Sequence, residues 1–219
     1  LAERAEVQAR RFGAAVTVPA DAVALDASGP HLVVGTRDGA TVACRAIVVA
    51  TGARYRRLPV PRLEEFEQTS VYYAATQVEA QFCVGDQVVV VGGGNSAGQA
   101  ALFLADHARG VRMVLREHDL DEFMSRYLAE RIQRDPRIEV HLRSEVRELV
   151  GDRGVLRAVV VEDTDTRQRQ TLAASELMVF IGADPCTGWL VGSVALDSGG
   201  YILAGTDAAT LLNRLLQSS

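Results

Sequence analysis

The sequence predicts an α/β fold with a parallel sheet, and two observations carry this prediction. Residues 87–91 form an apolar run, which is followed by three glycines, a helix of small residues over 96–108 and a second apolar run over 111–115. A strand, a helix and a second strand within about thirty residues match the length of a parallel crossover. The chain also has two related halves, because each contains a helix, a meander and an apolar strand that ends next to glycine.

The other elements follow from hydrophobic periodicity and turn residues. Residues 1–12 predict a helix that ends at Gly13, and 121–134 predict an amphipathic helix closed by Pro136. The apolar runs 46–50 and 177–181 predict strands buried on both faces. Alternation predicts two meanders, with strands at 15–18, 22–25, 31–35 and 41–43, and at 146–149, 156–162 and 168–172. We also expect strands at 138–142 and 201–203, a helix at 210–216, and an irregular connection between domains over 53–83.

The composition excludes several classes of protein. The 219 residues are 48% hydrophobic and 23% charged, which is ordinary globular usage. A net charge of −5 makes the chain a poor partner for nucleic acid or anionic lipid. No signal peptide is visible, and no apolar run reaches the ~18 residues that a membrane helix needs. We therefore expect a soluble, cytoplasmic protein without nucleic-acid or membrane partners.

The cysteines and histidines predict neither a disulfide framework nor a metal site. Cys44, Cys83 and Cys186 lie far apart and form no CxxC pair, which fits a reducing compartment. The four histidines form no i, i+4 pair, so we expect no metal. No residue qualifies as a catalytic acid or base. Residues 94–98 formally match a G-x-S-x-G nucleophile elbow, but the glycine run and the small-residue helix favour nucleotide binding over a hydrolase.

The glycine turn after residues 87–91 matches the pattern G-x-G-x-x-A at Gly92, Gly94 and Ala97. Gly92 permits a sharp strand-to-helix turn, Gly94 lets a pyrophosphate approach the backbone, and the small Ala97 lets the helix pack close to the strand. The free amides at the helix start would face the phosphates. We predict a dinucleotide site here that includes Gly93, Asn95 and Ser96; the alternative is a tight turn without a ligand.

Residues at the tip of the next predicted strand bear on the choice between NAD and NADP. An acid at this place accepts hydrogen bonds from the ribose hydroxyls, whereas arginine pairs with a 2′-phosphate. The sequence places Arg116 first and Glu117 directly after it, so the signal is mixed. Arg126 could return to the same pocket, although a solvated helix face is an equal alternative for it. We favour NADPH.

Four segments together resemble the low-molecular-weight thioredoxin reductases. They are VVVVGGGNSAGQAALFLA, the strand tip with Arg116, VFIGADP at 179–185 and IVVATGARYRRLPVP at 47–61. The resemblance implies two Rossmann-like three-layer domains, with an NADPH domain inserted in an FAD domain. The implied domains are a partial FAD domain over 1–73, a linker over 74–84, an NAD(P)H domain over 85–190 and a return segment of the FAD domain over 191–219. It also implies cofactor contacts at Thr51, Gly52, Ile181 and Gly182.

The chain departs from this family in two ways. The family's redox-active CATC segment corresponds here to Ala74, Ala75, Thr76 and Gln77, so a dithiol relay cannot form at that place. The strand–glycine turn–helix that holds the phosphates of FAD is absent, as is the family's closing Gly-Asp motif, so the chain looks truncated at both ends.

The resemblance implies a flavoprotein oxidoreductase in the full-length form. Hydride would pass from NADPH to FAD and onward to an unknown electron acceptor, without a redox-active CxxC. FAD is expected from the family, although its phosphate turn is missing from this chain. The alternative is a non-catalytic NADPH-binding module or sensor. A homodimer is a further expectation.

Overall fold

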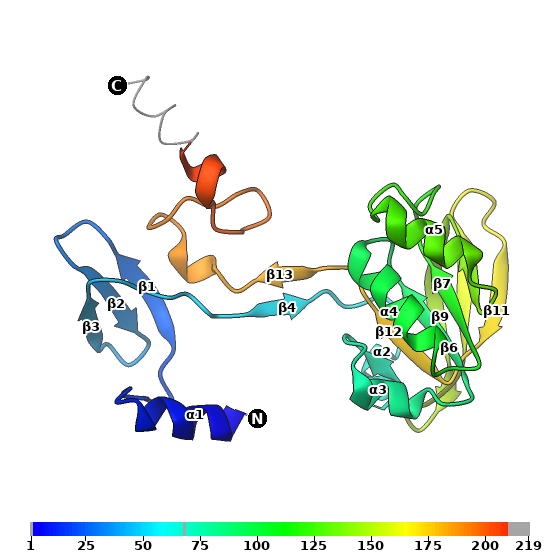
Figure 1. Ribbon diagram of the computed structural model, residues 1–219, viewed down its shortest axis with the longest axis horizontal. Coiled ribbons are helices and arrows are strands. Elements are labelled where there is room, and N and C mark those ends of the chain that lie inside the picture. Colours follow the sequence, from blue (N-terminus) through cyan, green and yellow to red (C-terminus); the bar gives the residue numbers. More distant parts are fainter. Residues whose placement is uncertain (1, 68, 210–219) are drawn as a thin grey trace. The chain divides into compact units, whose positions relative to one another are not determined.

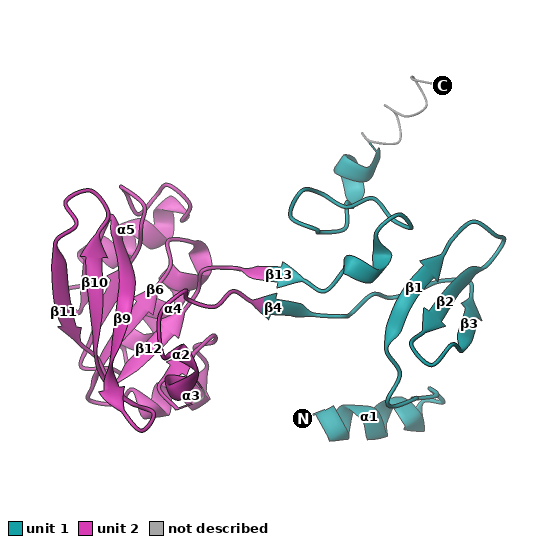
Figure 2. Cartoon of the chain, turned by 180° about the vertical axis from the view of Figure 1, so that it is seen from behind, with its two compact units in different colours: residues 1–54, 184–219 teal, residues 55–183 magenta. Residues whose placement is uncertain are grey.

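The computed structural model describes residues 2–67 and 69–209, and the chain divides into two compact units (Figure 2). Unit 1 comprises residues 1–54 and 184–219, and unit 2 comprises residues 55–183. Unit 2 is therefore inserted within the sequence of unit 1, as predicted. The units divide at 54/55 and 183/184, whereas the sequence places the domain limits near 73, 84 and 190. The assignment of FAD to one unit and NAD(P)H to the other stays a prediction.

Unit 2 is built on a five-stranded parallel sheet with the order β5–β12–β6–β7–β8. Its strands are β5 (Val71–Tyr72), β6 (Gln87–Val91), β7 (Gly110–Val114), β8 (Ile138–His141) and β12 (Glu176–Val179). The chain runs from β6 to β7 and β8 on one side and returns to β12 on the other. Ligands of parallel α/β sheets bind at the carboxyl end of the strands where the order reverses in this way.

Two further layers cover the sheet (Figure 1). Helices α3 (Gln77–Phe82), α4 (Asn95–Ala105) and α5 (Arg126–Arg134) lie on one face. An antiparallel sheet of β9 (Ser144–Asp152), β10 (Val155–Asp163) and β11 (Arg169–Ala173) lies on the other. The run of valines in β6 reflects this position, since Val88 and Val90 pack toward the helices and Val89 and Val91 toward the second sheet. The α/β fold class and the three layers are confirmed.

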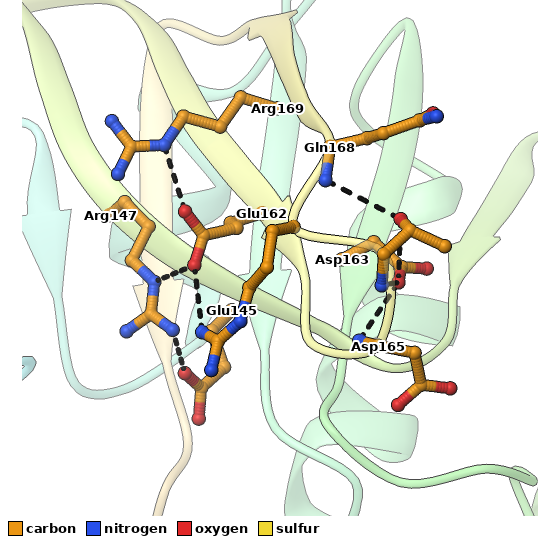
Figure 3. A network of polar contacts seen from close by, with 9 residues as sticks. Glu145, Arg147, Glu162, Asp163, Asp165, Gln168 and Arg169 are labelled. Atoms are coloured by element: carbon orange, nitrogen blue, oxygen red, sulfur yellow. Dashed lines mark hydrogen bonds and ion pairs between the residues drawn. The ribbon is translucent and has the colours of Figure 1, made fainter.

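A network of ion pairs on the antiparallel sheet centres on Glu162 of β10 (Figure 3). Its carboxylate accepts hydrogen bonds from Arg147 Nε at 3.1 Å, Arg167 Nη1 at 3.2 Å and Arg169 Nε at 2.9 Å. These bonds, the one from Arg169 foremost, lower the pKa of Glu162. Three arginines from the strands and loop around β10 thus share one carboxylate, so the network links the three strands of this sheet.

Unit 1 contains a helix and a small antiparallel sheet. Helix α1 (Ala2–Arg11) ends before Gly13, whose φ of 88° suits a helix terminator. Strands β1 (Ala22–Asp26), β2 (Leu32–Thr36) and β3 (Thr41–Cys44) form the sheet. The turn η1 (Gly188–Leu190) contacts β1, and Ser193 Oγ donates to the Leu25 carbonyl. Strands β4 (Ala53–Tyr55) and β13 (Ala183–Pro185) pair where the chain passes between the units.

Two predicted strands of the first half are wrong. Residues 46–50 have no regular structure, and Val48 is 92% exposed. An apolar run becomes a central strand only where neighbouring strands take up its backbone hydrogen bonds, and no strand in the described part of the chain pairs with it. Residues 15–18 likewise form no strand, and Val18 is exposed.

Residues 53–83 are more regular than predicted. They contain α2 (Leu63–Phe66), β5 and α3, and they place Phe66 and Cys83 in the two cores of unit 2. The predicted helix at 121–134 begins only at Arg126, after the N-cap Ser125. Residues 201–203 contribute one isolated bridge, between Leu196 and Ile202. The predicted helix at 210–216 lies outside the described residues.

Candidate dinucleotide-binding site

The turn between β6 and α4 requires glycine at position 92. Gly92 has a φ of 138°, and a Cβ built on it would lie 2.3 Å from the Phe180 carbonyl oxygen. Its amide donates to the Val114 carbonyl at 3.0 Å, which ties the turn to β7. The turn is thus held between β12 on one side and β7 on the other, so its backbone has a fixed position.

Gly94 has an open face, unlike Gly92. A Cβ built on Gly94 would meet no atom within 4 Å. Gly94 is the N-cap of α4, and no side chain caps the helix there. The first amides of a helix lack intrahelical partners and attract anions. The open face and the uncapped amides together form a cradle that fits a pyrophosphate.

Small residues bring α4 close to its neighbours. Ala97 is fully buried, and its Cβ lies 3.2 Å from the position a Cβ on Gly92 would take. A Cβ on Gly98 would lie 2.6 Å from Met124 Sδ. The small-residue pattern of the sequence therefore serves close packing around the turn.

Asn95 and Ser96 lie at the helix start. Asn95 Oδ1 accepts a hydrogen bond of 2.7 Å from the Ser125 amide, so the side chain fixes the segment that begins α5. Ser96 is exposed and lines a neighbouring pocket. The Asn95 contact is one that sequence reasoning missed, because nothing in the sequence pairs these two positions. That Asn95 and Ser96 contact a cofactor stays a prediction.

Three charged residues lie at the ribose end of the predicted site. Arg116 and Glu117 follow the tip of β7, and Arg126 is the first residue of α5. Arg116 is 76% exposed and Arg126 is 86% exposed, whereas the Glu117 side chain is only 11% exposed. The structure brings all three near the glycine turn, since Glu117 packs on Gly93 and Asn95 holds the residue that precedes Arg126.

Ile181 and Gly182 follow β12 at the same edge of the sheet. Ile181 packs on the core beneath the antiparallel sheet, and the Gly182 carbonyl accepts from the Arg56 amide at 3.0 Å. Thr51 and Gly52 belong to unit 1. There, Thr51 Oγ1 donates to the Cys186 carbonyl at 2.8 Å, and the Cys186 amide donates to the Gly52 carbonyl at 3.0 Å. This pair joins two loops of unit 1, and it forms no phosphate cradle of its own.

A pocket of about 420 Å³ lies beside the first turns of α4 in unit 2. Four aromatic rings, Tyr55, Tyr73, Phe103 and Phe180, line it together with Ala74, Ala75, Ser96, Gln99 and Ala100. The rings of Tyr55 and Tyr73 stack with centroids 5.8 Å apart. The pocket is open to solvent, and its lining combines the four rings with the polar side chains of Ser96 and Gln99. Sequence reasoning missed this pocket because its aromatic residues come from four separate segments.

The segment at 74–77 begins α3. Thr76 caps the helix, and the Thr76 amide donates to Glu79 Oε2 at 2.8 Å in a capping box. Cys83 is a buried free thiol whose pKa burial raises to about 12. Among the described residues, no cluster of histidine, cysteine or carboxylate side chains could hold a metal ion. Within the same part of the chain, every helix is too short or too polar to span a bilayer.

Comparison with known proteins gives the family. Residues 2–214 match the family model for pyridine nucleotide-disulphide oxidoreductases. The chain is 33% identical over 202 residues to a thioredoxin reductase of Streptomyces clavuligerus, covering 92% of this chain and 61% of that protein. It is 34% identical over 205 residues to NADPH-dependent thioredoxin reductase 3 of Arabidopsis thaliana, covering 93% of this chain and 38% of that protein.

A solved structure of a related protein supports the same family relationship. The thioredoxin reductase from Giardia duodenalis superposes with a TM-score of 0.76 at 30% identity, covering 93% of this chain and 65% of that one. The chain therefore belongs to the pyridine nucleotide-disulphide oxidoreductases, as the sequence motifs indicate. It spans less than two thirds of the length of these relatives, 61% in the case of the Streptomyces protein.

Proposed function

We propose that unit 2 binds a reduced pyridine dinucleotide with its pyrophosphate on the glycine turn. The observation that carries this proposal is the open face of Gly94 at the uncapped start of α4. Gly92 fixes the turn, and the amides of the first helical turn supply donors and the positive end of the helix dipole. Family membership supports the same ligand class.

The aromatic pocket suits the nicotinamide end of such a ligand. It adjoins the cradle through Ser96, and its rings offer flat apolar surfaces to a planar group. Ser96 and Gln99 add polar side chains at its rim that could orient an amide. In this arrangement, the chain's own residues bind and orient the dinucleotide, while the cofactors supply the chemistry.

By this proposal the protein is an oxidoreductase that binds and orients the dinucleotide, and FAD, which the family implies, would supply the electron-accepting chemistry when bound. FAD rests on the family alone, because Thr51 and Gly52 are engaged with Cys186 and form no phosphate cradle. The chain has no CxxC, and Ala74 and Gln77 stand where the family's dithiol is expected. The acceptor is therefore expected to take electrons without a cysteine relay.

The test is an anaerobic titration of the purified protein with NADPH and with NADH, followed by visible absorbance. Bleaching of the visible flavin absorbance by either dinucleotide supports the proposal. A protein that binds a dinucleotide but never reduces flavin would instead be the non-catalytic binding module. A protein that binds neither would contradict both functions.

A further inference from the structure

Glu117 occupies the corner between the tip of β7 and the glycine turn. A Cβ built on Gly93 would lie 2.5 Å from Glu117 Oε2 and 2.8 Å from its carboxyl carbon. The carboxylate thus lies directly on the backbone of the turn. The G-x-G-x-x-A pattern needs glycine at 92 and 94 but not at 93. A side chain at position 93 would have to displace the end of the Glu117 side chain from this place.

The backbone around Glu117 is held from both sides. The Arg143 amide donates to the Glu117 carbonyl at 3.0 Å. The Leu115 amide donates to the His141 carbonyl at 3.1 Å, and the Ser144 amide donates to the Leu115 carbonyl at 2.9 Å. These bonds tie the strand tip to the end of β8 and the start of β9. The backbone that carries the shielded Glu117 side chain is therefore held in place.

Arg116 and Arg126 are much more exposed to solvent than Glu117 is. Arg116 Nε forms an ion pair with Glu117 Oε1 at 3.6 Å, a separation too long for a hydrogen bond. Arg126 Nε bonds to Glu130 Oε1 at 3.0 Å, so part of its charge is already matched. In the described residues, no hydrogen bond occupies the Glu117 carboxylate, which leaves its oxygens free to accept from a ligand. The exposed guanidinium groups are screened by solvent.

We infer that Glu117 makes this site select NADH over NADPH. The inference rests on the proposed binding of a pyridine dinucleotide to the glycine turn. In a strand–glycine turn–helix unit, the adenosine ribose lies at the tip of the second strand. The shielded carboxylate of Glu117 can accept charge-assisted hydrogen bonds from the free ribose hydroxyls. A 2′-phosphate would instead bring a second anion against it in a shielded corner.

This inference departs from the expectation drawn from Arg116 and Arg126 alone. Both arginines are exposed side chains that would lose rotamer freedom on closing over a phosphate. The Glu117 carboxylate already lies beside the turn, and its side chain is only 11% exposed. One relative is named NADPH-dependent, so the preference proposed here would separate this chain from that protein.

The experiment measures the affinity for NADH and NADPH by calorimetric titration of the wild-type chain, of Glu117→Gln and of a matched control. Glu122→Gln is the control, because it removes the same charge from an exposed position in the segment before α5. We expect the wild type to bind NADH about tenfold or more tightly than NADPH. Glu117→Gln should shift this ratio toward NADPH by about tenfold, and Glu122→Gln should leave it unchanged.

A wild type that prefers NADPH overturns the inference and leaves the proposed function standing. So does an affinity ratio that Glu117→Gln fails to change. Failure of the wild-type chain to bind either dinucleotide overturns the proposed function, and this inference with it. Thermal melting of each variant confirms that it is folded before its affinities are compared.

Discussion

At the scale of single residues, Glu176 is the most strongly perturbed carboxyl group of unit 2. It is the first residue of β12, it is buried, and its Oε2 has no hydrogen-bond partner among the described residues. Burial raises the pKa of Glu176 to about 7, and the nearby charge of Asp86 adds to this. The raised pKa values of the neighbouring Cys83 and Tyr72 keep both side chains neutral at this pH, and Glu176 forms no ion pair within the described part of the chain.

Glu176→Gln is predicted to stabilise the protein above neutral pH. The folded pKa lies above the unfolded one, so the folded state holds the proton more tightly and stability falls as pH rises from about 4.5 to about 7. The glutamine variant lacks this loss and should gain roughly 2–3 kcal/mol at about pH 8 but little at about pH 4. Denaturant unfolding at both pH values measures the difference. If the substitution changed the free energy of unfolding equally at both pH values, the raised pKa of Glu176 would be contradicted.

At the scale of elements, the glycine turn and its strands could be predicted from sequence because their signals are local. A buried valine run, three glycines and a small-residue helix specify the unit β6–α4–β7 wherever its neighbours are present. Residues 46–50 carry an equally apolar run, but no described strand pairs with it and it stays irregular. A central strand depends on partners distant in sequence, which a local pattern cannot supply.

Within the candidate site too, features that depend on one local turn could be predicted, and features that depend on distant partners could not. Gly92, Gly94 and Ala97 were identifiable because each satisfies a steric requirement of one turn. The relative importance of Arg116 and Glu117 could not be predicted, because it depends on which side chain packs against Gly93. The aromatic pocket could not be predicted from the sequence either, because Tyr55, Tyr73 and Phe103 come together only in the folded unit.

A pair of substitutions separates the structural from the binding role of the turn. Gly92→Ala would force a Cβ against the Phe180 carbonyl at an unfavourable φ, so it should destabilise unit 2 by about 2 kcal/mol or more. Gly94→Ala meets no protein atom. It should change stability by less than about 1 kcal/mol yet weaken dinucleotide binding about tenfold or more. Thermal melting and calorimetry measure the two effects, and normal binding by folded Gly94→Ala would contradict the site.

At the scale of the whole molecule, unit 2 carries the parallel sheet and the glycine turn, and it is inserted within the sequence of unit 1. The sequence contains no CxxC pair, and its three cysteines are free thiols in the described residues. Cys83 is buried, and its raised pKa keeps it as an unreactive thiol at neutral pH. We therefore expect Cys83 to take no part in the proposed electron transfer.

Alkylation of the accessible thiols should leave the flavin-loaded protein active. Because no cysteine relays electrons, dinucleotide oxidation with an artificial quinone acceptor should keep its rate after alkylation and in Cys83→Ser. An aromatic disulfide should not be reduced. Loss of quinone reduction on alkylation, with the flavin still bound, would argue for a thiol relay.

The most direct test of the dinucleotide cradle is an NMR titration of the ¹⁵N-labelled chain with reduced dinucleotide. The backbone amides of residues 93–97 are predicted to shift in a saturable way, because they would donate to the pyrophosphate. If saturating dinucleotide left these amides unmoved while amides elsewhere shifted, the ligand would bind at another place and the account given for the glycine turn would be wrong.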